Sequence, residues 1–144
     1  MTPWPAAWAN VRRTDFVHNP NSSLFHGFVG LEYYDRAVAH IAKNISRPVF
    51  FVFSDDIQWC QDHIHLEHPT HIVSHQFAGN KFGAYFKLMS MCKDFIIPNS
   101  SFGWWAAWLC TNREKQIIAP KRWYLDPVLN DQTSDLIPSG WLRM

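Results

Sequence analysis

The sequence lacks the features that mark several large classes of protein. Its three cysteines, Cys60, Cys92 and Cys110, are odd in number and have no paired spacing, so we expect no disulfide framework and a reducing compartment. It has no run of like charges and a formal net charge of +1, which predicts no binding to nucleic acid or to an anionic membrane. No apolar run approaches the ~20 residues of a transmembrane helix. The opening MTPWPAAWAN lacks the basic and uninterrupted apolar regions of a signal peptide, so the sequence as given predicts a soluble, cytoplasmic protein.

What the sequence does contain is enough apolar surface for one folded domain. Of its 144 residues, 47% are hydrophobic and 16% are aromatic, and eight are tryptophan. A chain this apolar can offset its ordering entropy by burial. We therefore expect residues 1–144 to form a single domain.

Strand-like and helix-like segments alternate along the chain. Apolar runs rich in β-branched and aromatic residues predict strands at Trp8–Arg12, Val49–Phe53, Ile72–His75, Phe95–Pro98 and Gln116–Pro120. Segments with a helical period lie between them, at Glu32–Lys43, Ile57–Ile64, Lys81–Lys93 and Ser100–Thr111. This order predicts an α/β, Rossmann-like fold in which a parallel sheet carries helices on both faces. The last of these helices is so apolar that we expect it to be largely buried, with Trp104, Trp105 and Trp108 in the core rather than stacked on a sugar.

Polar residues follow four of the predicted strands, where ligands bind in sheets of this kind. They are Arg12-Arg13-Thr14-Asp15, Ser54-Asp55-Asp56, Ser74-His75 and Asn99-Ser100-Ser101. Because the carboxyl ends of parallel strands share one edge of a sheet, we expect these residues to converge on one site.

The residue types at this edge suit an anionic ligand. Arg12 and Arg13 can bind a diphosphate through paired hydrogen bonds, with Asp15 holding one arginine in place, although a surface Arg–Asp pair is the plainer alternative. Ser100 and Ser101 begin a helix, where backbone N–H groups favour an anion, although simple N-capping by Asn99 or Ser100 would explain the same residues.

The two aspartates and the histidines each have more than one possible role. Asp55 and Asp56 can accept hydrogen bonds from sugar hydroxyls, and Asp56 can equally cap the following helix. Five of the eight histidines fall within residues 63–75, close to Cys60, and imidazole is a common zinc ligand. Since no pair has the spacing of a zinc helix, we interpret this stretch as a solvated loop and predict no metal and no cofactor.

Six pieces of the chain match a known family in order. They are NVRRTDF, EYYDRAVAHI, VFFVFSDDIQWC, KLMSMCKDFIIPNSSFGWWAAWL, IIAPKRWY and DLIPSGWLRM. With these pieces the chain resembles the α-1,2-fucosyltransferases of glycosyltransferase family eleven, which are similar to a wider group sharing an HxRRxD signature. The resemblance implies the C-terminal, GDP-fucose-binding half of a GT-B-like enzyme, with the family's N-terminal acceptor domain absent from this sequence and another chain a candidate source of that half.

The activity that the resemblance implies is transfer of L-fucose from GDP-fucose to a galactose 2-hydroxyl of a glycan, with inversion and without a metal. It also implies association with a Golgi or bacterial inner membrane. The implied catalytic residues are Arg12, Arg13 and Asp15. The implied donor-binding residues are Arg12, Arg13, Asp55, Asp56, His75, Ser100, Ser101 and Phe102.

Three positions depart from the family's pattern. Asn10 stands in place of histidine, Tyr85 in place of an aspartate expected to recognise guanine, and Gly103 in place of serine. Asparagine cannot transfer a proton as histidine does, and tyrosine cannot accept two hydrogen bonds as a carboxylate does. A second hypothesis is therefore a catalytically impaired, truncated remnant that acts only as a nucleotide- or sugar-binding module.

Overall fold

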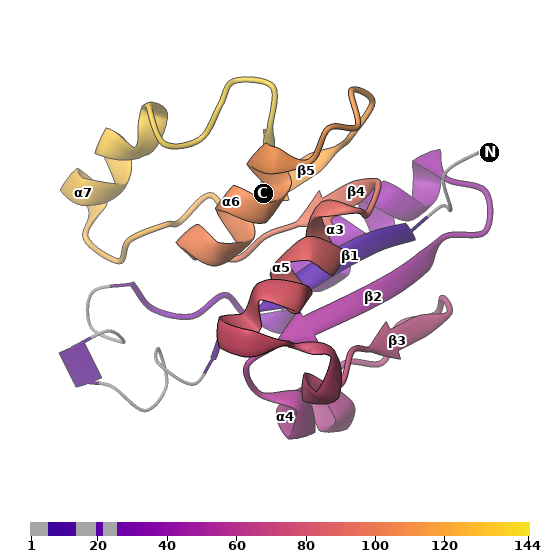
Figure 1. Cartoon of the computed structure of the whole chain (residues 1–144). Helices are drawn as coiled ribbons and strands as arrows, with labels where there is room; N and C mark the ends of the chain where they lie inside the picture. The colour runs from indigo at the N-terminus through magenta and orange to yellow at the C-terminus, as the bar shows by residue number, and fades with distance from the viewer. Residues whose placement is uncertain (1–5, 14–19, 22–25) are drawn as a thin grey trace.

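A six-stranded parallel sheet forms the centre of the molecule (Figure 1). The computed structural model describes residues 6–13, 20–21 and 26–144. The strands are β1 (Ala6–Val11), β2 (Val49–Ser54), β3 (Thr70–Ile72), β4 (Asp94–Ile96), β5 (Ile117–Ala119) and β6 (Leu142–Arg143). They lie in the order β3-β2-β1-β4-β5-β6, which confirms the predicted α/β, Rossmann-like class.

The strand order reverses next to β1. From β1 the chain builds outward through β2 to β3, and it then returns to the other side of β1 to form β4. The register runs from Ala6 opposite Val49 to Val11 opposite Ser54 on one side of β1, and pairs Ala9 with Ile96 on the other. The carboxyl ends of β1 and β4 therefore flank the point at which such sheets bind ligands.

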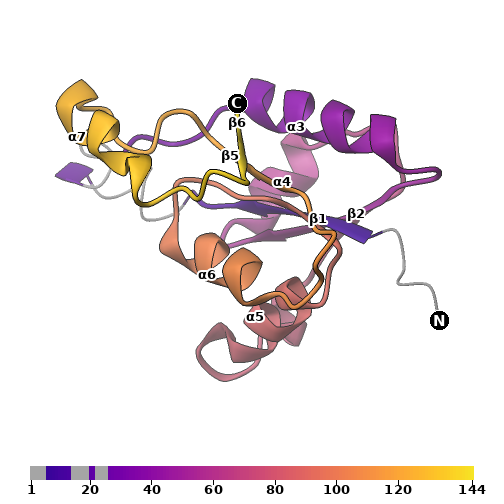
Figure 2. The same cartoon turned by 90° about the horizontal axis from the view of Figure 1, so that it is seen from above.

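Helices cover both faces of the sheet (Figure 2). On one face lie α3 (Leu31–Asn44) and α4 (Ile57–His63), and on the other lie α5 (Gly83–Ser90) and α6 (Ser101–Leu109). Side chains of β1 alternate between the two layers, since Ala7, Ala9 and Val11 pack with α3 whereas Trp8 packs with α5 and α6. The hydrophobic stripe of the helix predicted at Glu32–Lys43 is confirmed in α3.

The bounds of several predicted elements differ from those in the structure, and two of the differences have a clear local cause. The strand predicted at Ile72–His75 ends at Ile72, because the Ser74 side chain accepts a hydrogen bond from the Gln76 amide and begins a short 3₁₀ turn. The helix predicted from Lys81 begins at Gly83, because Lys81 and Phe82 have φ angles of 50° and 59°, in the left-handed region.

The C-terminal segment contains elements that the sequence pattern did not predict. A short helix, α7 (Pro127–Asp131), is capped by the Asp126 side chain, which accepts hydrogen bonds from the amides of Val128 and Leu129. After it, β6 adds to the sheet beside β5. This segment covers the carboxyl end of β4 and helps to build the site described below.

The expectation that α6 is a buried core helix was wrong for two of its tryptophans. Trp105 and Trp108 are each 50% exposed. The helix packs on the sheet through small residues instead: a Cβ placed on Gly103 would lie 3.2 Å from Pro98 Cδ, and Ala106 and Ala107 are fully buried. Small residues on the inner face let α6 approach the sheet closely, so its wide side chains point outward.

None of the helices in the described residues is long and apolar enough to cross a membrane.

Candidate active site

Three of the four strand ends that the sequence predicted to converge bring polar residues to the same edge of the sheet. Arg12 follows β1, Asp55 follows β2, and Ser100 and Ser101 follow β4. Arg12 Nε lies 3.4 Å from Asp55 Oδ2, so the ends of β1 and β2 are joined by an ion pair. The Ser54 hydroxyl adds a second link by donating to the Val11 carbonyl at 2.7 Å.

The two adjacent arginines take different places. Arg13 packs against α4, with its guanidinium carbon 3.9 Å from the centroid of the Trp59 ring. Its Nε lies 3.7 Å from Asp56 Oδ2, and its amide donates to Asp55 Oδ1 at 2.8 Å. Asp56 also accepts from the Trp59 amide at 3.1 Å, so the capping alternative for Asp56 is realised.

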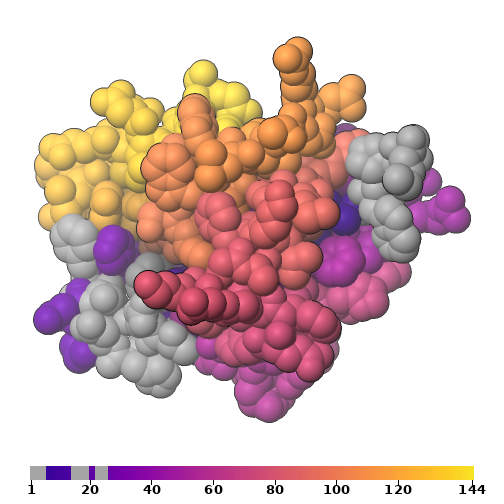
Figure 3. Space-filling view, viewed as in Figure 1, coloured from indigo at the N-terminus to yellow at the C-terminus, as the bar shows by residue number. Residues whose placement is uncertain are grey.

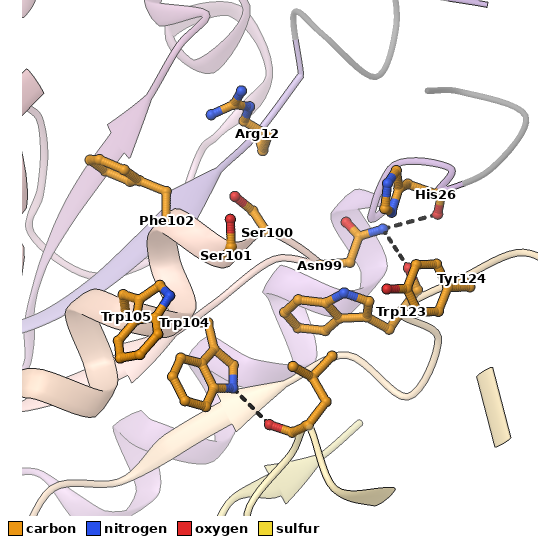
Figure 4. A pocket seen from close by; sticks show the side chains of 11 residues that line it. Arg12, His26, Asn99, Ser100, Ser101, Phe102, Trp104, Trp105, Trp123 and Tyr124 are labelled. Carbon is orange, nitrogen blue, oxygen red and sulfur yellow. Dashed lines mark hydrogen bonds between the residues drawn. The ribbon is translucent and has the colours of Figure 1, made fainter. Parts of the chain in front are cut away.

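Arg12 lines a cavity of about 440 Å³ between β1, α6 and the C-terminal segment (Figure 4). Ser100, Ser101 and Phe102, from the beginning of α6, form one wall, with Trp104 and Trp105 further along the helix. The remaining lining residues are His26, Asn99, Trp123, Tyr124 and Leu136. We call this space the aromatic cavity.

The first turn of α6 is open toward the aromatic cavity. Ser100 occupies the N-cap position, yet its side chain makes no capping hydrogen bond. Asn99 does not cap the helix either, because its Nδ2 donates to the carbonyls of His26 at 2.9 Å and Trp123 at 3.1 Å. The simple capping alternative is therefore not realised, and the amide groups of this turn are placed to attract an anion.

A second cavity, of about 450 Å³, lies on the other side of Arg12. We call it the polar cavity. Besides Arg12 and Phe102, which line both cavities, it is lined by Asn10, Val11, Ser54, Asp55, Lys81, Phe82 and Tyr85. Its lining thus combines a carboxylate, a guanidinium and an ammonium group with three aromatic rings.

The three positions that depart from the family's pattern lie at or beside the polar cavity. Asn10 is buried, and its Oδ1 has no hydrogen-bond partner among the described residues. Tyr85 is buried against Phe53, and its hydroxyl donates to the Val73 carbonyl. Burial raises the pKa of Tyr85 to about 12, so this hydroxyl stays protonated at neutral pH. Gly103 faces Asn10, since its added Cβ would lie 3.4 Å from Asn10 Oδ1.

Three of the predicted site residues line neither cavity, namely Arg13, Asp56 and His75. His75 Nε2 donates to the Ser54 carbonyl at 2.8 Å, and the His75 ring packs on Tyr85. Asp15 lies outside the described residues.

The histidine-rich stretch makes separate local contacts. His63 bonds to the Trp59 carbonyl, His65 to the Asp62 carbonyl, and the His71 ring stacks on Phe51. Within residues 6–13, 20–21 and 26–144, no three metal-ligating side chains come together.

Sequence reasoning missed several residues of the aromatic cavity, among them His26 and Trp123. These two are brought there by Asn99, which lies 73 and 24 positions away in the chain. Burial lowers the pKa of His26 below its usual 6.5, so its ring is neutral at pH 7. A hydrogen bond across 73 positions leaves no local pattern, which is why no signal in the sequence pointed to it.

The sequence model of Glycosyl transferase family 11 matches residues 8–143. The chain belongs to this family. It is 32% identical over 135 residues to the O-antigen biosynthesis glycosyltransferase WbnK of Escherichia coli, covering 94% of the chain and 43% of that relative. It is 35% identical over 140 residues to an alpha-1,2-colitosyltransferase of the same organism, covering 94% and 46%. It is also 30% identical over 101 residues to galactoside alpha-(1,2)-fucosyltransferase 2 of Pongo pygmaeus, covering 69% and 29%.

The family 11 chain described here spans less than half the length of each of these relatives. No solved structure matches it.

Proposed function

We propose that this chain is the donor-binding half of an α-1,2-fucosyltransferase that uses GDP-fucose, inverts the anomeric centre and needs no metal. The observation that carries the proposal is the position of Arg12, which lies between two cavities and beside the open first turn of α6. A nucleotide sugar has its diphosphate between two bulky ends. A central cation flanked by two cavities suits such a diphosphate, with the nucleoside in one cavity and the transferred sugar near Arg12, facing the other cavity, where an acceptor must meet it.

In this proposal Arg12 and the first turn of α6 hold the diphosphate. The bond between the fucose anomeric carbon and the phosphate oxygen breaks as the galactose 2-hydroxyl oxygen attacks from the opposite face, and the proton of that hydroxyl is released to water. The negative charge that develops on the departing GDP is offset by the Arg12 guanidinium and by the amides near Ser100 and Ser101. These groups are fixed before the reaction, which is how charge stabilisation lowers a barrier.

The remaining polar residues have supporting roles. Asp55 is within reach of the polar cavity and can accept hydrogen bonds from donor hydroxyls while it orients Arg12. Asp56 and Trp59 hold Arg13, so we assign Arg13 to positioning the strand end rather than to direct contact with the diphosphate. The acceptor glycan would be held with the help of the half of the fold that the longer relatives possess.

Calorimetric titration of the chain with GDP and with GDP-fucose tests the proposal. A charge-assisted hydrogen bond contributes about 1.5–3 kcal/mol, so Arg12→Gln should weaken binding of either ligand roughly 10- to 100-fold. Arg36→Gln, which removes an exposed arginine from α3, is the matched control and should leave binding unchanged. Folded protein that binds neither ligand at millimolar concentration would refute the donor site.

Transfer itself is measured separately, with lactose as acceptor and with EDTA present. The donors should include both a fucosyl and a colitosyl nucleotide, because one relative is named for colitosyl transfer and another for fucosyl transfer to a galactoside. An α-linked product formed in EDTA supports an inverting, metal-independent reaction with the β-linked donor. A β-linked product or a requirement for added metal would contradict it.

The second candidate function is a nucleotide- or sugar-binding module without transfer. The observation in its favour is that Asp55, the carboxylate in the described lining of the polar cavity, is already paired with Arg12, while Asn10 offers no titratable proton. GDP binding without any transfer, also when a longer relative's acceptor half is added, would select this function.

A further inference from the structure

Helix α6 presents two half-exposed tryptophans. Trp105 and Trp108 are each 50% exposed, although exposing so large an apolar ring forgoes the stabilisation of burial. Side chains of α5 and α6 form the middle of the surface in Figure 3. The two tryptophans belong to one helix and have equal exposure, yet only one of them lines the aromatic cavity, namely Trp105.

The orientation of the Trp105 ring is fixed by a neighbour that is itself anchored. The Trp104 indole donates to the Leu136 carbonyl at 2.8 Å, and its ring meets Trp105 edge-on, with centroids 4.9 Å apart. Figure 4 shows Trp105 beside Trp104 on the helix that begins at Ser101. The cavity therefore has a positioned aromatic wall close to the open first turn of α6.

The inner wall of the same cavity holds an unused hydrogen-bond acceptor. Asn99 is 3% exposed, and its Oδ1 has no partner among the described residues, while its Nδ2 is occupied by carbonyls. In Figure 4 this oxygen points away from His26 and Trp123 and toward the side of Ser100. A buried carbonyl oxygen without a donor favours a ligand that brings a hydroxyl.

An aromatic face, a buried acceptor and a serine hydroxyl are complementary to a pyranose ring. A pyranose presents carbon-bound hydrogens on one face and hydroxyl groups around its edge. We propose that the aromatic cavity binds the galactose ring of the acceptor, stacked on Trp105 and donating a hydroxyl hydrogen to Asn99 Oδ1. This inference rests on the proposed function, because it assigns the second substrate of the same reaction.

The galactose of the acceptor fits better than the donor's own sugar because of where Trp105 lies. Its half-exposed ring forms the open rim of the cavity, whereas Ser100 and Asn99 are buried on the inner side. An acceptor must enter from solvent after the donor phosphates are in place. A rim-side platform is accessible to it at that stage.

Saturation-transfer NMR with methyl β-D-galactoside, with GDP present, tests the inference. Trp105→Leu should lower the affinity for the galactoside roughly 2- to 10-fold, the range expected for loss of an aromatic contact. Trp105→Phe should retain part of that affinity. Trp108→Leu is the matched control, because Trp108 lines neither cavity; its ring stacks on Trp104, with centroids 5.3 Å apart, so its effect should be clearly smaller than that of Trp105→Leu. The circular dichroism spectrum and the affinity for GDP should be unchanged in all three variants, which would show that the fold is intact.

Each contrary outcome points to a distinct failure. A galactoside affinity that is unchanged in Trp105→Leu, or lowered equally in Trp108→Leu, overturns the platform. Displacement of the galactoside by GDP-fucose but not by GDP assigns the cavity to the donor sugar and overturns the acceptor assignment. If the unaltered chain binds GDP but not the galactoside, this inference alone is refuted. If it binds the galactoside but not GDP, the proposed donor site is refuted and this cavity is left as a sugar site.

Discussion

Replacement of Asn99 tests whether a single side chain holds the wall of the aromatic cavity. Asn99 Nδ2 has two hydrogens, which it shares among the carbonyls of His26 at 2.9 Å, Trp123 at 3.1 Å and Gly27 at 3.3 Å. These contacts join residues 26–27 and the C-terminal segment to the end of β4. Alanine at position 99 removes both donors from these carbonyls, of which that of Trp123 is buried.

The expected loss of stability follows from those bonds. A buried hydrogen bond contributes about 1 kcal/mol net, and an unsatisfied buried group costs about 1–3 kcal/mol. Asn99→Ala should therefore lower the free energy of unfolding by about 2–4 kcal/mol. Asn99→Asp keeps the shape but turns both donors into acceptors beside three carbonyls, so it should be at least as destabilising at pH 7. Its deficit should shrink in acid, where the carboxyl group is protonated and can donate once.

Urea denaturation followed by tryptophan fluorescence measures these differences. The matched control is Asn44→Ala, because Asn44 donates to the His40 carbonyl at 3.3 Å but is exposed. It should change the free energy of unfolding by less than about 0.5 kcal/mol. An Asn99→Ala variant within that same margin of the unaltered chain would refute the role of this side chain, as would an aspartate variant of undiminished stability.

Two further substitutions have expected effects on stability. Lys115 Nζ donates to the carbonyls of Ala107, Trp108 and Cys110 at the end of α6, so Lys115→Met should lower the free energy of unfolding by about 1–2 kcal/mol in urea denaturation, and no loss would contradict the cap. Asp94 is fully buried, and burial raises its pKa, so the folded state takes up a proton more readily than the unfolded chain. The contribution of Asp94 to the free energy of unfolding should thus fall as pH rises from below about 4, the unfolded value, through the raised folded pKa. Asp94→Asn should remove that fall, and the variant should be more stable than the unaltered chain by about 1 kcal/mol at pH 7. Urea titrations between pH 3 and 7 measure this difference. A variant that is less stable at pH 7 would refute the reasoning.

The order of elements and the edge that carries the site followed from local patterns in the sequence. The apolar run Val49–Phe53 and the helical stripe of α3 each reflect which faces are buried, and the polar residues after β1, β2 and β4 meet because parallel strands end at one edge. The exposure of Trp105 could not be predicted from a local pattern in the same way. Both faces of α6 are apolar, so hydrophobic period does not distinguish the inner face, and the small residues Gly103 and Ala106 were the signal that did.

Contacts between distant segments account for most of what the sequence did not predict. The two-residue strand β6 is too short to have a pattern, and it forms because it can pair with β5. The bond from Asn99 to His26 likewise depends on the completed fold. Both features belong to the same side of the sheet, so the aromatic cavity was less predictable than the residues that follow β1 and β2.

The different places of Arg12 and Arg13 follow from the alternation of β1. Successive side chains of a strand point to opposite faces, and Trp8 and Asn10 face the α5 and α6 layer whereas Val11 faces the α3 and α4 layer. Continued past the end of the strand, the same alternation sends Arg12 to the cavities and Arg13 to Trp59 on α4. Two adjacent arginines leaving a strand therefore do not form a pair around one ligand: one is available to bind it, and the other fixes the strand end that presents the first.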